Sequence, residues 1–388
     1  MKCIDRVVED GRVQAALHSF HQNQKRQLEL IVSIQQIPAP TFAEAQRAQF
    51  VHEQFLAAGL VDVHQDALSN VYGRLPGAQP GPPLIVSAHL DTVFPPETDL
   101  TIKRNGRLLY GPGIGDNATG VAGLILVAQA ILANQLQPKQ DVWFVANVCE
   151  EGLGDLRGMR AVVDKFGDKA VYIVVEGGLY GQISHEAIGV SRHRITVIGP
   201  GGHSWGSFGA PSAIHILAKI VTAIAAIRPA AAPRTSYNVG TIEGGSSINT
   251  IAQSASLQLD LRSENVAALD ALVNQVRVIV AETAYLYLAE GVDVEMTQIG
   301  QRPAGSIPRE TDLVQLAVAA LAHVGCPDVT FMRGSTDANV PLSRGITAVC
   351  IGLTQSGNAH RTDEYIDPLH LPHGLGQLLL LILAADFH

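Results

Sequence analysis

The stretch at residues 83–93, PLIVSAHLDTV, predicts both the fold and the chemistry of this chain. An apolar run typical of a buried strand ends in His89, and the acidic residue Asp91 follows two positions later. Residues two apart on an extended chain point the same way, so Asp91 can hold the His89 ring and determine which ring nitrogen is free. Metal-binding histidines are usually oriented like this, so we expect a metal ligand at His89. Alone, the pattern also fits a strand that ends in a polar turn.

Apolar runs of this kind recur, and polar residues able to bind a metal stand at their ends or just before a helix predicted at residues 118–133. These residues are Asp116, Glu150, Glu151, Glu176 and His360. Continuous apolar runs suit strands buried on both faces. They predict an α/β fold with a mostly parallel sheet and helices on both faces. In such sheets the ligand crevice lies outside the carboxyl ends of the strands, so the polar side chains should converge there.

The charge of this group argues for metal ions. Four carboxylates in one crevice repel each other, and some would stay protonated unless cations neutralise them. Two divalent ions would balance the four charges, and a carboxylate-bridged pair of ions can activate water. Mixed histidine and carboxylate ligands suit Zn²⁺, although Mn²⁺ or Co²⁺ could also bind. The alternative is that these acids are unrelated helix caps and surface turns.

Four short motifs make a family resemblance specific. They are His-x-Asp-Thr at 89–92, Gly-Asp-Asn at 115–117, Glu-Glu-Gly at 150–152 and Glu-Gly-Gly at 176–178. With these motifs the chain, from about Leu28 to its end, resembles the zinc-dependent exopeptidases and aminoacylases. That family includes carboxypeptidase G, acetylornithine deacetylase, succinyl-diaminopimelate desuccinylase and peptidase T. The resemblance implies a zinc-exopeptidase fold for the α/β domain.

The resemblance also implies how two metal ions are held. Residues His89 and Glu176 would bind one ion, and Glu151 and His360 would bind the other. Asp116 would bridge the two ions.

Three further features follow from the same resemblance. Glu150 would be the general base that takes a proton from water and passes it to the leaving amine. Asp91 would orient His89. The peptide bond between Asp116 and Asn117 would be cis.

The middle of the chain contributes further candidates. Gly-Gly-His-Ser at 201–204 resembles a segment whose histidine reaches across a dimer into the partner's active site, where it steadies the developing oxyanion. His203 is therefore a catalytic candidate, although a lone histidine in such a segment is more often an ordinary loop residue. By the same resemblance, substrate contacts are expected from Asn249, Arg262, Gly334 and Ser335. Ser335 replaces a glycine of the family, which leaves the substrate open.

The chain has an insertion. Residues 192–199 and 256–262 alternate between polar and apolar, as half-exposed strands do, and helices are predicted at 212–227 and 265–290. Two helices on one face of a small sheet predict a ferredoxin-like α+β module at residues 189–302. The remainder, 1–188 and 303–388, would form the catalytic metal-binding domain. An exposed edge strand of the insertion could pair with its copy, so we expect a homodimer.

Composition limits the class of protein. The chain has 388 residues, 47% hydrophobic and 16% charged, which favours large buried cores over disorder. Its net charge of −9, without a basic run, argues against nucleic acid and anionic membrane as partners. The longest purely apolar run, 378–385, is too short to cross a bilayer. Four cysteines without paired spacing fit a reducing compartment, so we expect a cytoplasmic protein.

Two classes of function stay open. The first is a hydrolase that cleaves an amide bond in small peptides or N-acyl amino acids; the second is a non-catalytic dimeric binding or scaffold relative. Within the hydrolases, glutamate at 176 is more typical of deacylases and carboxypeptidases. The Asp-Ala-Asn stretch at 337–339 and the loop 360–364 resemble tripeptidase-like aminopeptidases instead.

Overall fold

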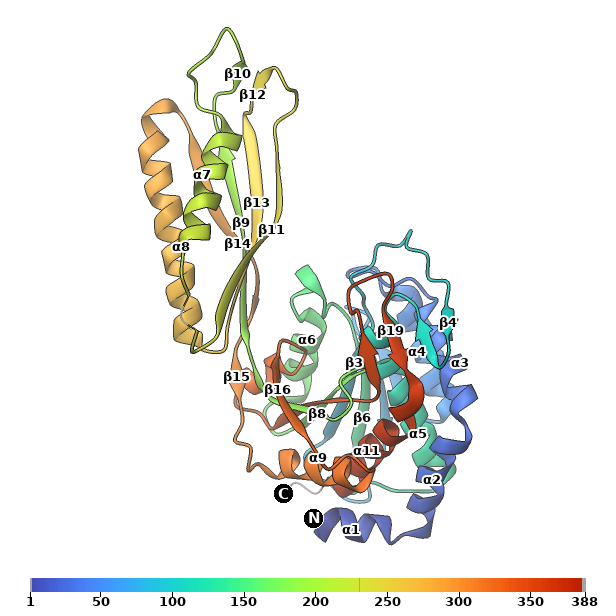
Figure 1. The fold of residues 1–388 in the computed structure, drawn as a ribbon. Coiled ribbons are helices and arrows are strands. Elements are labelled where there is room, and N and C mark those ends of the chain that lie inside the picture. The colour runs from blue at the N-terminus through green and yellow to red at the C-terminus, as the bar shows by residue number, and fades with distance from the viewer. Residues whose placement is uncertain (1, 230, 386–388) are drawn as a thin grey trace. The chain divides into compact units, whose positions relative to one another are not determined.

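The computed structural model describes residues 2–229 and 231–385 (Figure 1). The chain divides into two compact units, each with its own hydrophobic core. The first consists of Met1–Ala187 and Gly305–His388, and the second of Ile188–Ala304. The second unit is thus inserted into the first.

A nine-stranded sheet forms the centre of the first unit. Its order is β1 (Val61–Gln65), β2 (Val71–Leu75), β6 (Val142–Asn147), β3 (Leu84–His89), β7 (Val171–Glu176), β17 (Ala348–Gly352), β8 (Gln182–Ala187) and β15 (Gly305–Ser306), with β16 (Thr330–Gly334) also paired to β8. The middle strands β6, β3, β7 and β17 are parallel and almost entirely buried. Their continuous apolar sequences are those of strands covered on both faces.

The sheet is mixed, so the prediction of a mostly parallel sheet was wrong at its margins. On one side β2 pairs antiparallel with both β1 and β6. On the other, β8 pairs antiparallel with β17 and β15. β1 and β2 are connected by residues 66–70 alone, too short a link for the crossover that parallel neighbours need.

Helices cover the sheet of the first unit. They are α1 (Lys2–Val8), α2 (Gly11–Gln22), α3 (Gln24–Gln35), α4 (Ala45–Ala58), α5 (Gly120–Ala133), α6 (Arg157–Phe166), α9 (Asp312–His323), α10 (Asn339–Ser343) and α11 (Leu371–Ala384). In Figure 1, α6 lies on one side of the sheet and α4 and α5 on the other. By length and composition Ile114–Ala133 could cross a membrane, but 78% of its most apolar stretch is buried, as in a core helix.

A smaller sheet and short helical turns complete the first unit. The sheet runs β18 (Gln355–Gly357), β19 (Tyr365–Asp367), β5 (Leu108–Tyr110) and β4 (Lys103–Asn105). The turns are η1 (Ile114–Thr119), η2 (Gly152–Gly154) and η4 (Pro368–His370). Because β19 pairs with β5, the loop that contains His360 is tied to the segment that leads to Asp116.

The second unit is a four-stranded antiparallel sheet covered by two helices. Its order is β11 (Thr235–Gly244), β13 (Ser254–Ser263), β9 (Gly189–Ile198) and β14 (Asp293–Arg302). α7 (Ala213–Ala226) and α8 (Val266–Tyr287) lie on one face of this sheet, and η3 (Leu288–Glu290) follows α8 (Figure 1). The chain order and strand order are those of a ferredoxin-like module. A separate pair, β10 (Gly202–His203) and β12 (Thr250–Ile251), carries His203.

Candidate metal centre

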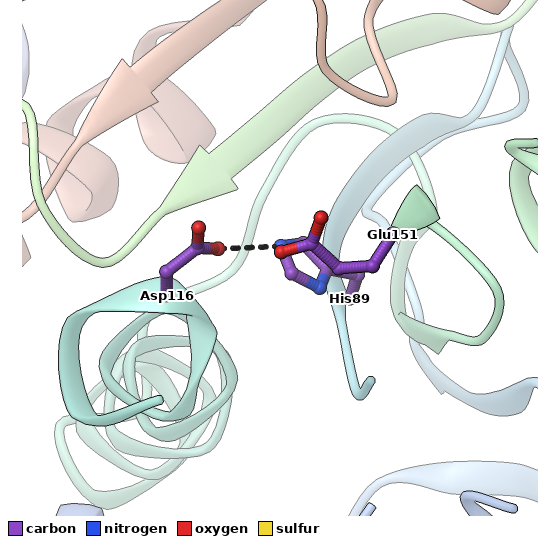
Figure 2. A group of neighbouring side chains, drawn as sticks. All are labelled: His89, Asp116 and Glu151. Atoms are coloured by element: carbon purple, nitrogen blue, oxygen red, sulfur yellow. Dashed lines mark hydrogen bonds and ion pairs between the residues drawn. The ribbon is translucent and has the colours of Figure 1, made fainter. Parts of the chain in front are cut away.

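His89 lies at the carboxyl end of β3 and is 2% exposed. Its Nε2 is 3.0 Å from Asp116 Oδ1, the contact drawn in Figure 2. The same nitrogen is 3.7 Å from Glu176 Oε2, at the end of the neighbouring strand β7. The peptide bond between Asp116 and Asn117 is cis, so that prediction is confirmed.

His360 approaches the same Asp116 carboxylate from another loop. Its Nε2 is 3.2 Å from Asp116 Oδ2 and 3.0 Å from Glu151 Oε1. The two oxygens of Asp116 therefore face two different imidazoles, those of His89 and His360. The structure thus brings together all five residues that were predicted as ligands.

Asp91 is fully buried and contacts more than the His89 ring. Nδ1 of His89 is 3.0 Å from the Asp91 carbonyl oxygen and 3.6 Å from its Oδ1. The carboxylate accepts hydrogen bonds from the Glu150 and Glu151 N–H groups and the Thr41 hydroxyl, each at 2.9 Å. Because a carbonyl oxygen only accepts, Nδ1 is the donor and Nε2 remains for a metal. Asp91 thus lies beside the ring with both its carbonyl oxygen and its carboxylate, and the carboxylate also holds the Glu150–Glu151 turn.

The turn after β6 places two adjacent glutamates near the cluster. Cys149, two residues after the end of β6, has a left-handed backbone conformation with φ of 58°, so the chain turns there. Its N–H donates to Glu44 Oε1 at 3.0 Å. Glu150 and Glu151 are each 5% exposed, and Glu151 reaches His360. A sharp turn explains how neighbours that would point apart on a strand can both be buried here.

Asn117 connects the turn of Asp116 to the strand that carries Glu176. Its Nδ2 donates to Val175 O at 2.9 Å, and its Oδ1 accepts from Gly177 N at 2.8 Å. A side chain at Gly177 would place its Cβ 2.0 Å from the carbonyl oxygen of Gly115. The glycine after Glu176 therefore permits the close approach of these two segments.

The carboxylates of the cluster favour positive charge on the groups beside them. Burial alone would lower the pKa of His89, but hydrogen bonds to carboxylates, Asp116 first, raise it well above the ordinary value. Hydrogen bonds to Asp116 and Glu151 raise the pKa of His360 to about 10. Burial opposes ionisation of Asp116, yet the two histidines hold its pKa below the usual range. Protonated histidines would therefore offset part of the negative charge of the carboxylates.

The donor set fits divalent metal ions. Single ligand atoms of His89, Asp116 and Glu151 lie within 4.8 Å of one another. Imidazole nitrogens and carboxylate oxygens in this combination are suitable ligands for Zn²⁺ and related ions. Burial raises the pKa of Glu176, and the negative charges of Asp116 and Glu151 act in the same direction.

The other predicted residues lie outside this cluster. His203, Asn249 and Arg262 are all in the second unit. Nδ1 of His203 accepts hydrogen bonds from the Trp205 and Gly206 N–H groups at 3.2 and 3.3 Å.

Two of the other four predicted residues have side-chain partners within the second unit. The Arg262 guanidinium pairs with Asp260 at 2.8 Å, and Asn249 Oδ1 accepts from the Ser247 hydroxyl at 2.7 Å. Gly334 ends β16 in the first unit, and Ser335 follows it.

Two buried carboxylates near the site were not predicted. Asp337 is fully buried, and its Oδ2 accepts a hydrogen bond from Asn147 Nδ2 at 2.7 Å. Burial raises the pKa of Asp337 to about 7. Burial, together with the charge of Asp116, raises the pKa of Glu364 to about 7 as well. Both lie in segments that the sequence analysis had already singled out, 337–339 and 360–364.

Comparison with known proteins identifies the family. The model of peptidase family M20/M25/M40 matches residues 85–384, which include all five candidate ligands. A succinyl-diaminopimelate desuccinylase of Corynebacterium glutamicum is 24% identical and covers 84% of this chain and 88% of its own length.

Solved structures show the same fold. A tripeptidase from Staphylococcus aureus superposes with a TM-score of 0.76 at 23% identity, over 93% of this chain and 98% of its own. A dinuclear metal-binding peptidase of family M20 from Bacillus subtilis has a TM-score of 0.67 at 16% identity, over 94% of this chain and 98% of its own.

These findings confirm the resemblance that the motifs predicted, and they do not favour a non-catalytic scaffold. The protein is a metal-dependent hydrolase of amide bonds. The chain belongs to peptidase family M20/M25/M40.

Proposed function

We propose that this enzyme cleaves small peptides or N-acyl amino acids with two divalent ions, Zn²⁺ first and Mn²⁺ or Co²⁺ as alternatives. One observation carries the proposal: each oxygen of Asp116 faces the Nε2 of a different histidine. A second carboxylate lies beside each of those nitrogens. Such symmetry is expected of a bridged pair of metal sites.

We assign the ligands accordingly. His89 and Glu176 would hold one ion, Glu151 and His360 the other, and Asp116 would bridge them. The bound ions would supply Lewis-acid chemistry, polarising the scissile carbonyl and lowering the pKa of water.

We assign proton transfer to Glu150. Its neighbour Glu151 contacts His360 at 3.0 Å, and the N–H of Glu150 is held by Asp91, so its backbone position is fixed at the edge of the cluster. The Glu150 carboxylate would take a proton from the attacking water and transfer it to the leaving amine.

We infer that the second unit forms a homodimer and supplies His203 to the partner's site. Two backbone N–H groups occupy Nδ1 of His203, so its Nε2 carries the proton and can donate to an oxyanion. Trp205 and Phe208 beside it are 88% and 92% exposed, which suits a contact surface. The edge strand β11 also exposes most of its side chains and could pair with its copy.

Complementation tests the shared site. A His203→Ala subunit mixed with a Glu150→Ala subunit should recover activity, because one of the two sites then receives an intact base and an intact histidine. Each variant alone should remain inactive. If mixed dimers form and no activity returns, the exchange of His203 between subunits is wrong.

Two classes of substrate are candidates: N-acyl amino acids and tripeptides. Relatives include a desuccinylase and a tripeptidase, and Glu176 and the 360–364 loop favour one class each. We propose Asn249, Arg262, Gly334 and Ser335 as substrate contacts. A panel of N-acyl amino acids, dipeptides and tripeptides, assayed with Zn²⁺, Mn²⁺ and Co²⁺, separates deacylase from tripeptidase. We place the enzyme in the cytoplasm because Cys149, Cys326 and Cys350 are unpaired.

A further inference from the structure

The Glu364 carboxylate is fully buried and accepts three backbone hydrogen bonds from the turn that carries Asp116. Its Oε2 accepts from Gly113 N at 2.7 Å. Its Oε1 accepts from Gly115 N and from Asp116 N, both at 2.8 Å. The carboxylate thus holds the backbone of the proposed bridging ligand directly.

The turn around Glu364 is shaped for this carboxylate. Gly113 has φ of 71°, a conformation that glycine adopts without strain. A Cβ at Gly115 would lie 2.9 Å from Glu364 Oε1 and 2.9 Å from the Ser356 side chain. Small residues at both positions therefore allow three N–H groups to converge on one anion. Three backbone N–H groups donate to this one side chain, so the contact holds the turn at three points.

Glu364 also ends the loop that carries His360. Its carbonyl oxygen accepts a hydrogen bond from Gly111 N at 2.8 Å, and its N–H donates to Arg361 O at 3.0 Å. His360 itself has φ of 65° and stands four positions earlier in this loop. One residue therefore contacts the turn of Asp116 through its side chain and is covalently part of the loop of His360.

We propose that Glu364 is a positioning residue that sets the spacing between Asp116 and His360, and so the affinity of the ion held by Glu151 and His360. This inference rests on the proposed two-ion function. Asp116 and His360 come from segments far apart in sequence, and their contact of 3.2 Å depends on how the two loops are joined. Asn117 anchors the other side of the same turn to β7, so Glu364 chiefly governs the His360 side.

Glu364→Gln is the sharpest test. Both carboxylate oxygens accept from N–H groups, so an amide NH₂ of the same shape must face at least one donor. The expected result is that purified, dialysed Glu364→Gln binds one ion as the wild type does and binds the second 10–100-fold more weakly, the usual loss when an outer-shell partner is removed. Calorimetric Zn²⁺ titration and metal analysis provide the readout without any activity measurement.

Two companion variants make the test specific. Asp141→Asn is the matched control: Asp141 accepts from Gly77 N at 2.9 Å at the opposite end of β6, so both ions should bind as in the wild type. In a His360→Ala background the second site is already lost, and adding Glu364→Gln should leave the affinity of the remaining ion unchanged. If the glutamine variant does not fold, Glu364→Asp replaces it, because it keeps the charge but cannot reach all three donors.

The outcomes are distinct. Weakening of one ion alone supports the inference. Wild-type affinity for both ions in the folded Glu364 variant overturns it, as does equal weakening of both ions, which indicates a general structural role. If the wild-type protein itself binds fewer than two ions, the proposed two-ion function is wrong. That result is distinct from one in which only the role of Glu364 is wrong.

Discussion

Replacement of Asp91 by asparagine should damage the site without touching a ligand. The two carboxylate oxygens accept different hydrogen bonds. Oδ1 accepts from Glu150 N, and Oδ2 accepts from Glu151 N and the Thr41 hydroxyl. An asparagine offers one oxygen, so its NH₂ must face one of the two buried N–H groups. It also removes the negative charge beside the His89 ring, 3.6 Å from Nδ1.

The size of the effect follows from these contacts. A hydrogen bond to a charged group contributes about 1.5–3 kcal/mol, and Asp91 is fully buried, so solvent does not replace the lost acceptor. We expect Asp91→Asn to lower the free energy of unfolding by about 2 kcal/mol, within that range. Metal affinity should fall about 10–100-fold, as for other residues that orient a ligand.

Denaturant unfolding of the metal-free protein and calorimetric Zn²⁺ titration measure the two effects separately. Thr41→Val is the matched control. It removes one neutral donor and leaves in place the hydrogen bonds that Asp91 accepts from the N–H groups of Glu150 and Glu151. It should lower the free energy of unfolding by only about 0.5–1.5 kcal/mol and leave metal affinity nearly unchanged. The reasoning is refuted if Asp91→Asn is as stable as the wild type and binds both ions equally well.

Two other predictions concern the ligands themselves. Glu151→Gln should weaken one ion outright, since a neutral amide replaces an anionic ligand; unchanged metal content by elemental analysis after dialysis would contradict this. The raised pKa of His360, about 10, means that its ring is protonated in metal-free protein at neutral pH. Metal binding should therefore release protons and strengthen as pH rises from 6 to 8; calorimetry in buffers of different ionisation enthalpy measures the release, and binding without proton release would refute it.

The site was predictable from sequence because strand ends and motifs coincide. His89 and Glu176 end buried strands, and Glu151 follows one closely, so their convergence follows from the topology of a parallel sheet. The antiparallel margins were missed because β1 and β8 carry no apolar run long enough to show how they pair.

Contacts between side chains and remote backbone could not be predicted in the same way. Glu364 binds the turn of Asp116, which precedes it by about 250 positions, and no local pattern specifies that pairing. The Asp91 carboxylate, expected beside the His89 ring, also accepts hydrogen bonds from the turn at Glu150, which no local pattern predicts. Such contacts arise only once the chain has folded, so spacing along the sequence does not reveal them.

Glu150→Gln tests the central claim most directly, through metal content and turnover measured on the same preparation. Glu150 is proposed to move a proton and not to bind an ion, so the variant should retain both ions and still bind substrate. Its turnover should fall by about 10²–10⁴-fold, the range for loss of a general acid–base. If Glu150→Gln loses an ion, or keeps both and turns over at the wild-type rate, the assignment of base and ligand is contradicted.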